Sequence, residues 1–242
     1  MSFEILNSKD HASLRINTQA RAEFGDQVMQ CITFPFEFRN IQAWYPIFFQ
    51  TDRDSNLYPL ALFGFEEGEN LFLQEPDWKA GYVPAMMRRE PFLIGVKEGQ
   101  DAAGEIHQAR VLSIDVEHPR VSQEEGESLF NPLGDRTDYL EEQANLLETL
   151  HDGLSHCQAF TQTLQEYELI EDVTLDIRLN DGTHNQMIGL SAVNEDAVRE
   201  LTGDQLEKLS KEGFLMPLYM AIASMSNVQR LIELKNDRVA AA

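Results

Sequence analysis

The stretch that decides the fold is aromatic and punctuated by proline. It reads IQAWYPIFF from Ile41 to Phe49, YPLALFGFEEGENLFLQ from Tyr58 to Gln74, and DWKAGYVPAMMRREPFLIGV from Asp77 to Val96. Short apolar runs separated by turn-forming residues are typical of β-strands. Together with a later run they predict strands at Ile41–Phe49, Tyr58–Phe65, Leu71–Leu73, Phe92–Val96 and Ala109–Val116.

Two polar connectors separate the first three of these runs. Asp52–Asn56 has the residues of a tight turn, and Glu66–Asn70 is a short polar piece between apolar runs. Connectors of this kind join antiparallel neighbours in hairpins. Just upstream, the alternating run Cys31–Phe38 predicts an edge strand broken by Pro35, because proline cannot donate to a sheet. The N-terminal half should therefore form a mainly antiparallel sheet.

A long amphipathic helix should follow this half. The sequence Asn131–Asp135 is a turn, and Asp135 is a candidate N-cap. Beyond it, apolar and small residues recur at helical spacing on one stripe, which we interpret as core packing rather than a coiled-coil surface. They are Leu140, Leu147, Leu150, Leu154, Cys157, Thr161 and Leu164, and the other face carries Glu141, Glu142, Glu148, Asp152 and Glu166.

The last third of the chain predicts a β-hairpin and short helices. The hairpin runs through Val173–Leu179, a turn at Asn180–Gly182, and Gln186–Val193. Three helices should come next, since Asn194 can cap one, Thr202 and Gln205 have capping-box spacing for another ending at Gly213, and Pro217 suits the first turn of a third running to Leu234. No flexible linker interrupts the sequence. We predict one α+β domain spanning residues 1–242.

The charge of the chain limits its partners. Forty-one acidic residues against nineteen basic ones give a net charge of −22, which repels a phosphate backbone. Nucleic acid is therefore not expected as a partner. The acidic excess is concentrated between Val121 and Asp172, where we interpret it as a solvated surface rather than a cation site.

Cysteine usage and hydropathy bear on location. Cys31 and Cys157 are far apart and lack metal-ligand spacing, so free thiols are the default and one long-range disulfide is the alternative. No segment has the roughly 18 uninterrupted apolar residues of a spanning helix, and the N-terminus does not read as a signal peptide. We expect a cytoplasmic protein, with cell-surface association through signal-less export as the alternative.

Motifs for catalysis are missing. The sequence contains no GxGxxG after a strand, no GxxxxGK[ST], no HExxH and no GxSxG. His151 and His156 are five residues apart and so fall on different helix faces, and the consecutive carboxylates Glu66-Glu67 diverge in a strand. We assign no catalytic residue, no metal ligand and no cofactor.

The pair Arg88-Arg89 is the strongest candidate for function. It lies between the apolar runs Val83–Met87 and Pro91–Ile94, so at least one guanidinium should approach the core and require an anionic or carbonyl partner. The simpler interpretation is an internal salt bridge. The functional one is a site for a carboxylate or other anion, with aromatic walls from Trp78, Tyr82 and Trp44.

The same blocks carry a family resemblance covering about residues 30–235. The chain resembles the SapC family of bacterial proteins, named from a surface-layer (S-layer) gene cluster. The resemblance rests on Trp44-Tyr-Pro-Ile47, Tyr58-Pro-Leu-Ala-Leu-Phe-Gly64, Asn70-Leu-Phe-Leu73, Trp78, Tyr82-Val-Pro-Ala85, Arg88-Arg89-x-Pro91-Phe92, Gly189-Leu190, Gly213-Phe-Leu215 and Leu218-Tyr219.

The resemblance implies a role beside other proteins rather than a known reaction. Genes of the family often neighbour TonB-dependent receptors, hydroxylases of the cupin or 2-oxoglutarate type, and flavin-dependent halogenase-like proteins. We favour a non-catalytic binding or accessory protein that takes an anionic ligand or peptide. The alternatives are an enzyme, or enzyme partner, acting on peptides or amino-acid derivatives, and a structural surface-layer component.

Overall fold

The computed structural model describes residues 2–100 and 106–241, with side chains outside 97–108. Its largest sheet has five strands in the order β12-β13-β4-β5-β3, and every neighbouring pair is antiparallel. The strands are β3 (Gln30–Ile32), β4 (Ile47–Thr51), β5 (Leu57–Leu62), β12 (Ile170–Arg178) and β13 (His184–Val193). The α+β prediction is confirmed, including the hairpin turn at Asp52–Asn56 and the edge position of β3.

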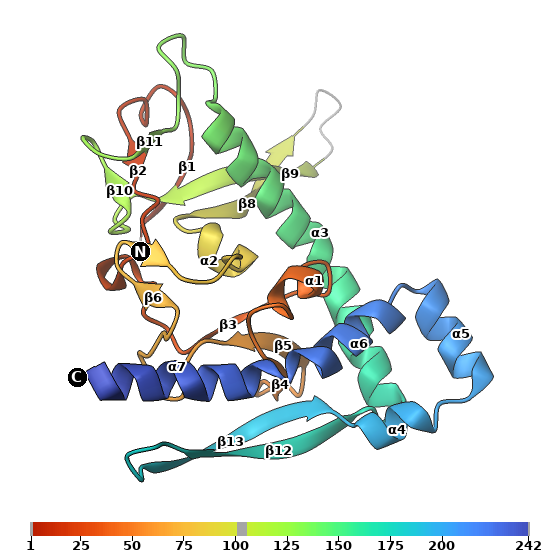
Figure 1. Ribbon diagram of the computed structural model, residues 1–242. Coiled ribbons are helices and arrows are strands. Elements are labelled where there is room, and N and C mark those ends of the chain that lie inside the picture. Colours follow the sequence, from red (N-terminus) through yellow and green to blue (C-terminus); the bar gives the residue numbers. More distant parts are fainter. Residues whose placement is uncertain (1, 101–105, 242) are drawn as a thin grey trace.

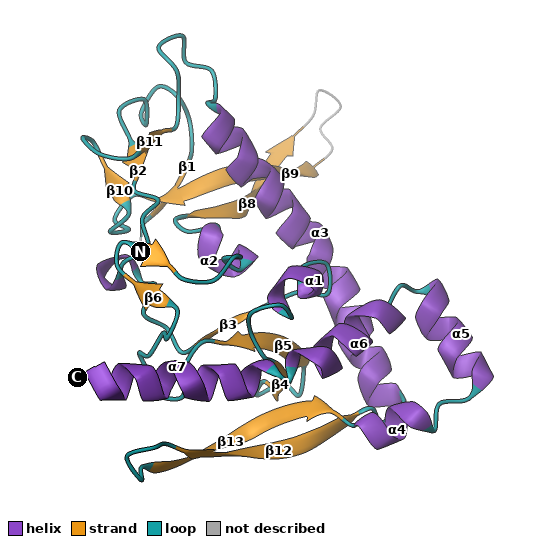
Figure 2. Cartoon of the chain, in the orientation of Figure 1, coloured by secondary structure: helices purple, strands orange, loops and turns teal. Residues whose placement is uncertain are grey.

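A second sheet and two small ones complete the β-structure (Figures 1 and 2). The second sheet has the order β1-β9-β8, one small sheet has the order β10-β2-β11, and β6 pairs with β7. These strands are β1 (Phe3–Ile5), β2 (Arg15–Ile16), β6 (Leu73–Gln74), β7 (Asp77–Trp78), β8 (Phe92–Gln100), β9 (Ile106–Asp115), β10 (Val121–Ser122) and β11 (Glu127–Ser128).

Two strand predictions are wrong in detail. The first half of Ile41–Phe49 is not extended, because α1 (Phe38–Ile41) and a turn precede β4. There Tyr45 donates its backbone N–H to the carbonyl of Ile41, which places both side chains in the core. The Glu66–Asn70 connector also does not make a hairpin with β5. Asn70 accepts from the backbone N–H of Phe72 and turns the chain towards β7 instead.

The helix α3 (Asp138–Glu166) links the two parts of the fold. Figure 1 shows it running from the side of β8 and β9 to the neighbourhood of α4, and it packs against β8, β11 and β5. Its N-cap is Thr137, whose side chain accepts from the N–H of Leu140. Asp135 is not the cap, because it belongs to the preceding turn, where its N–H donates to Asn131 Oδ1.

The buried face of α3 changes along its length. Its first half contributes to a core with β8, β9 and β11, and its last turns contribute to the core of the five-stranded sheet. Leu154 is 55% exposed, contrary to the predicted stripe, because it lines the open groove beside α3. The change between the two cores comes after Cys157, and Phe160 and Thr163 are buried beyond it. The other residues of the predicted stripe are buried.

The C-terminal helices are α4 (Glu195–Arg199), α5 (Gly203–Lys211), α6 (Leu215–Ser224) and α7 (Asn227–Ala241). The capping residues Asn194 and Thr202 act as predicted. The third predicted helix, however, is divided in two. Ser224 accepts from the N–H of Ile47, and Asn227 donates to the carbonyls of Gln42 and Tyr45, so the break is tied to the start of β4.

Two further short helices lie in the N-terminal half, η1 (Ala22–Phe24) and α2 (Ala85–Arg88). The helix α2 connects the two cores, because Ala85 is fully buried in the smaller one while Met87 packs against the larger. Among the described helices, none has both the length and the apolar character needed to cross a membrane.

Candidate functional site

A buried carboxylate organises the aromatic segment. Glu37 is 1% exposed and accepts three hydrogen bonds, from Thr33 Oγ1 at 2.8 Å, from Tyr82 Oη at 2.8 Å and from the N–H of Ala85 at 2.9 Å. Hydrogen bonds of this kind offset the loss of hydration of a buried charge. Glu37 therefore fixes both the Tyr82 ring and the first residue of α2.

Tyr45 extends this network to Trp78. Trp78 Nε1 donates to Tyr45 Oη at 2.7 Å, and Tyr45 Oη donates to the carbonyl of Tyr82 at 2.5 Å. Burial raises the pKa of Tyr45 and of Tyr82, and the charge of Glu37 raises that of Tyr82 further. Both hydroxyls stay protonated and act as donors. These hydrogen bonds connect Trp78 to Glu37 through Tyr45 and Tyr82. They stabilise the fold, and most of the polar side-chain groups of these four residues are engaged in them.

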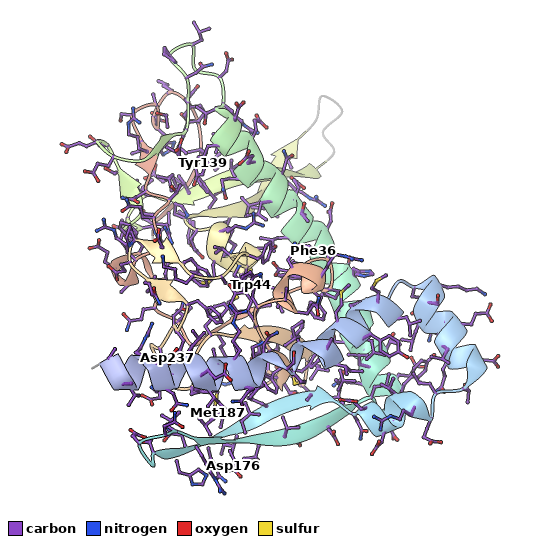
Figure 3. The ribbon with its side chains drawn as sticks, in the orientation of Figure 1. Phe36, Trp44, Tyr139, Asp176, Met187 and Asp237 are labelled. Carbon is purple, nitrogen blue, oxygen red and sulfur yellow. The ribbon has the colours of Figure 1, made fainter. Side chains whose placement is uncertain are left out.

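Trp44 belongs to a different contact. Its ring lies under the guanidinium of Arg230 at 4.6 Å from the ring centroid, which is a cation–π contact with α7. Gly81 lies so close to the same ring that a Cβ there would be 2.5 Å from Trp44 Cζ2. Figure 3 places Trp44 beside α1 and Tyr139 at the start of α3, well apart in the molecule.

The two candidate arginines face different cavities. Arg89 pairs with Glu90 at 2.9 Å, donates to the carbonyl of Phe92, and lines a large groove of about 1190 Å³. Arg88 is exposed, lies over the Tyr82 ring at 5.3 Å, and lines a separate pocket. Among the residues whose side chains the structure describes, no carboxylate oxygen lies within 4.0 Å of the Arg88 guanidinium, whose Nη2 donates to Tyr82 Oη at 3.4 Å. The structure thus brings Arg88 and Trp78 together and leaves Arg89, Tyr82 and Trp44 outside their pocket.

We call this second cavity the small pocket. Its volume is about 360 Å³, within the roughly 300–1,000 Å³ typical of small-molecule sites. Its lining combines apolar walls with a polar floor and comes from the N-terminal segment, the β6–β7 hairpin, α2, Arg120 and the first turns of α3. The residues are Ile16, Asn17, Thr18, Ala20, Asp26, Pro76, Asp77, Trp78, Val83, Met87, Arg88, Glu90, Arg120, Tyr139 and Gln143.

The floor of the small pocket is built on a buried ion pair. Arg120 Nη2 contacts both carboxylate oxygens of Asp26, at 2.5 and 2.6 Å, and Nη1 donates to the carbonyls of Asn17 and Gln19. The side chains of Arg120 and Asp26 are 9% and 3% exposed. The Nε atom of Arg120 is buried and has no hydrogen-bond partner among the described residues.

Two residues one turn apart on α3 add further unpaired groups. Gln143 Oε1 is buried without a partner, and no hydrogen bond of the Tyr139 hydroxyl is found in the part of the chain that the structure describes. Burial raises the pKa of Tyr139, so its hydroxyl keeps its proton. Residues four apart on a helix share a face. Arg120, Tyr139 and Gln143 all line the small pocket, but Arg120 Nε and Gln143 Oε1 are themselves buried away from its open space.

The charges around the small pocket leave one arginine uncompensated. Asp26 is paired with Arg120, Asp77 Oδ2 with Lys79 at 2.7 Å, and Glu90 with Arg89. Arg88 is the lining cation whose described surroundings contain no such carboxylate. The pocket can therefore accept an anion at its edge.

The large groove has a different character. It lies between α3, the edge strand β3 and the start of β8, and its lining is mostly apolar, with Ile32 and Leu154 both exposed. Its second arginine, Arg110, is held by Glu148 at 2.6 Å and Asp152 at 3.2 Å. Both arginines of this groove are thus engaged by carboxylates of the protein.

The cysteines are free, as expected, and the described residues contain no cluster of three or more His, Cys, Asp or Glu side chains able to hold a metal ion. Burial raises the pKa of Cys157 to about 12, and burial together with the charge of Glu37 raises that of Cys31. Both are protonated thiols at neutral pH, which are poor nucleophiles.

Sequence reasoning missed the residues that define the network and the pocket floor: Glu37, Asp26, Arg120, Tyr139 and Gln143. One of them left a readable signal, because Glu37 stands within the apolar run Cys31–Phe38 four residues after Thr33. A lone carboxylate in such a run has to find hydrogen-bond donors. The other four residues have ordinary polar neighbours in the sequence, and they come together only in the folded chain.

Comparison with known proteins supplies a family. The family model described as SapC matches residues 6–231, which is most of the chain and begins nearer to the N-terminus than the resemblance predicted from the aromatic blocks. No curated protein and no solved structure matches the chain.

Proposed function

The chain belongs to the SapC family, and we propose that it acts as a binding protein whose small pocket holds an anionic ligand. The observation that carries this proposal is the position of Arg88. It lines a cavity of ligand size beside Trp78, and no carboxylate of the described residues neutralises it. One guanidinium nitrogen, Nη2, donates to the Tyr82 hydroxyl at 3.4 Å, and the remaining N–H groups can hydrogen-bond a carboxylate.

The surroundings of Arg88 support this role. Its guanidinium rests on the Tyr82 ring, whose position is fixed by Glu37 in turn. An arginine held in place before binding loses less conformational freedom when the ligand arrives. Trp78 provides an apolar wall that is itself fixed by its hydrogen bond to Tyr45.

The experiment is a titration of the full chain with small carboxylates, followed by isothermal titration calorimetry. Replacing Arg88 by Gln should weaken binding by roughly ten- to a hundredfold, since a hydrogen bond to a charged group contributes about 1.5–3 kcal/mol. Arg53→Gln is the matched control, because it removes the same charge from the exposed Asp52–Asn56 turn. Equal affinities for Arg88→Gln, Arg53→Gln and the unaltered protein would overturn the proposal.

We also propose that the ligand-bound protein serves a partner enzyme or uptake system. The gene neighbourhoods implied by the family resemblance support this role. The large groove is a surface on which such a partner can bind. Affinity purification of the tagged chain from its native host, followed by mass spectrometry, tests it. Recovery of a hydroxylase, a halogenase-like enzyme or a TonB-dependent receptor supports the proposal, and recovery of no specific protein counts against it.

A further inference from the structure

The large groove follows an open edge of the second sheet. Strand β8 ends the order β1-β9-β8, so within the part of the chain that the structure describes one of its sides has no neighbouring strand. Leu93 and Ile94 both line the groove, although consecutive residues of a strand point to opposite faces of a sheet. A cavity that contacts both faces must pass along the edge between them. The groove therefore runs beside the backbone of β8.

The hydrogen bonds to β9 show which backbone groups of β8 face this edge. Asp115 donates its N–H to the carbonyl of Pro91, and the register continues without a shift along both strands. In an antiparallel ladder, residues that bond to the neighbouring strand alternate with residues whose N–H and C=O point away from it. Ile94 and Val96 therefore direct these groups away from β9. No hydrogen bond to them comes from the residues that the structure describes outside the sheets.

The edge is closed at one end and open beyond it. Phe92, the first outward residue, donates its N–H to the carbonyl of Arg89, and its own carbonyl accepts from Arg89 Nη1. Val96 is 58% exposed. An exposed edge with unpaired N–H and C=O groups is a template on which another chain can pair.

Apolar walls stand on both sides of the groove. The helix α3 supplies one wall, and the segments around β3 and α2 supply the other. The wall residues are Leu147, Leu150 and Leu154 on α3, with Ile32, Phe34 and Met86 opposite. Apolar side chains of a strand added at β8 can be buried between these walls.

The charges of the groove favour a cationic residue on its occupant. Arg110 is shared between Glu148 at 2.6 Å and Asp152 at 3.2 Å, so two carboxylates face one guanidinium. The Asp152 side chain is 69% exposed and lines the groove. A second copy of this chain is a poor occupant, because two molecules with a net charge of −22 repel each other.

Resting on the proposed role of this groove in partner binding, we infer that the groove takes an extended segment of a partner protein, which adds to β8 as a further strand of the second sheet. The segment pairs its backbone with Ile94 and Val96, places apolar side chains between the groove walls, and directs a lysine or arginine towards Asp152. Addition of a strand to a sheet edge gives affinity through main-chain hydrogen bonds, and the pockets beside it give specificity.

Two isomers of one peptide test the backbone pairing. The probe is fluorescein-labelled Lys-Val-Thr-Val-Thr-Val-Lys amide, and its binding to the full chain is measured by fluorescence anisotropy. One isomer carries N-methyl groups on two consecutive central amides, and the other carries them on two alternate amides. Consecutive methyl groups place one methyl against the edge in any register, whereas alternate ones can both point outwards. The consecutive isomer should bind at least about tenfold more weakly than the alternate one.

A substitution in β8 tests the same edge from the side of the protein. Val96→Pro removes an N–H that points away from β9, so the ladder between the two strands is kept, and binding of the probe should weaken by about two- to tenfold. Val96→Ala is the matched control, because it keeps the N–H, and it should bind within about twofold of the unaltered protein. If Val96→Pro does not fold, the two peptide isomers still decide.

The charge contact has its own test. Asp152→Asn should weaken binding of the lysine probe by about two- to fivefold and leave a probe with norleucine in place of both lysines unchanged. Equal affinity of Asp152→Asn and the unaltered protein for the lysine probe would remove the cationic residue from the inference and overturn that part of it.

The outcomes distinguish this inference from the proposed partner role. Equal binding of the two isomers, or no binding of the probe, overturns strand addition and leaves the purification experiment unaffected. If a partner recovered by purification binds Val96→Pro as tightly as the unaltered protein, the partner role stands and pairing at β8 is wrong. A dimer of the chain that Val96→Pro dissociates in analytical ultracentrifugation would assign the edge to a second copy and would also overturn the inference.

Discussion

Tyr82 donates its hydroxyl to Glu37 at 2.8 Å across 45 positions of the chain, and this bond places the ring on which Arg88 rests. Tyr82 was predicted as a wall of the ligand site. The face of its ring contacts the Arg88 guanidinium, and its hydroxyl donates to the buried Glu37. The bond therefore connects the stability of the aromatic segment with the geometry of the small pocket.

Replacing Glu37 by Ala should destabilise the protein by about 3 kcal/mol, because Thr33, Tyr82 and the N–H of Ala85 lose their acceptor together. Glu37→Gln should cost about 1 kcal/mol or less. It retains one oxygen for Tyr82 and Ala85, and the Thr33 hydroxyl can rotate to accept from the amide. Urea unfolding measures both variants, and equal losses would show that the charge matters more than the shape.

Gly81 should not tolerate a side chain. A Cβ at this position would lie 2.5 Å from Trp44 Cζ2, so Gly81→Ala must displace the ring and its contact with Arg230, at a cost of about 1–3 kcal/mol. Gly203→Ala is the control, since nothing lies within 4 Å of its Cβ position at the start of α5. Thermal unfolding should show a lower midpoint for the first variant and an unchanged or higher one for the second.

The start of α3 can be tested with two substitutions. Thr137→Ala should destabilise the protein by about 1 kcal/mol, because the N–H of Leu140 loses its cap. Asp135→Ala should have a smaller effect, since the turn is held mainly by Asn131 Oδ1, which accepts from Leu133 and Asp135 backbone N–H groups. A larger loss for Asp135→Ala in denaturant titrations would restore Asp135 as the cap.

His118 should make stability depend on pH. Burial lowers its pKa, as does the charge of Arg120, although Glu90 acts in the opposite direction. The folded pKa is then below the unfolded value of about 6.5, so the unfolded chain binds protons more readily as the pH falls. The contribution of His118 to stability is complete above that value and decreases as the pH falls from it towards the folded pKa.

The reason is visible in the geometry, because His118 Nδ1 accepts from the N–H of Arg120 at 3.2 Å and cannot do so when protonated. The measurement is the free energy of unfolding at pH 7.5 and pH 5.0. His118→Asn keeps an acceptor two residues before Arg120 but does not titrate, so it should lose less stability than the unaltered protein over this range. An equal loss in both would assign the effect to the many carboxylates.

Local features of the sequence predicted much of the fold. The Asp52–Asn56 turn, the hairpin of β12 and β13, and the capping box of Thr202 and Gln205 were found because neighbouring residues determine them. The segment from Ile41 to Tyr45 was misassigned because a short apolar run fits a strand and a buried helical turn equally well. Leu154 was misplaced because it faces the open large groove, which its spacing in the sequence does not record.

The candidate site was harder to predict. The sequence indicated Arg88 and Trp78, which do line one pocket, but their neighbours Arg120 and Gln143 come from distant segments without any motif. The sequence named Arg88 and Arg89 as candidates for one site but did not say which of them would serve it. They diverge because Arg88 ends α2 while Arg89 follows it and leads into β8.

The Asp26–Arg120 ion pair also has a kinetic consequence. It closes a loop of 94 positions, and the entropy of closing it must be overcome before the pocket floor exists. Contacts of such long range slow folding, whereas β4–β5 and β12–β13 pair neighbouring segments, so these two hairpins can form hydrogen bonds before the floor is assembled. We expect refolding chains to regain their circular dichroism before they regain affinity for ligand. Ligand binding would then report the completion of folding, and a chain cleaved near its N-terminus would retain secondary structure but lose its ligand.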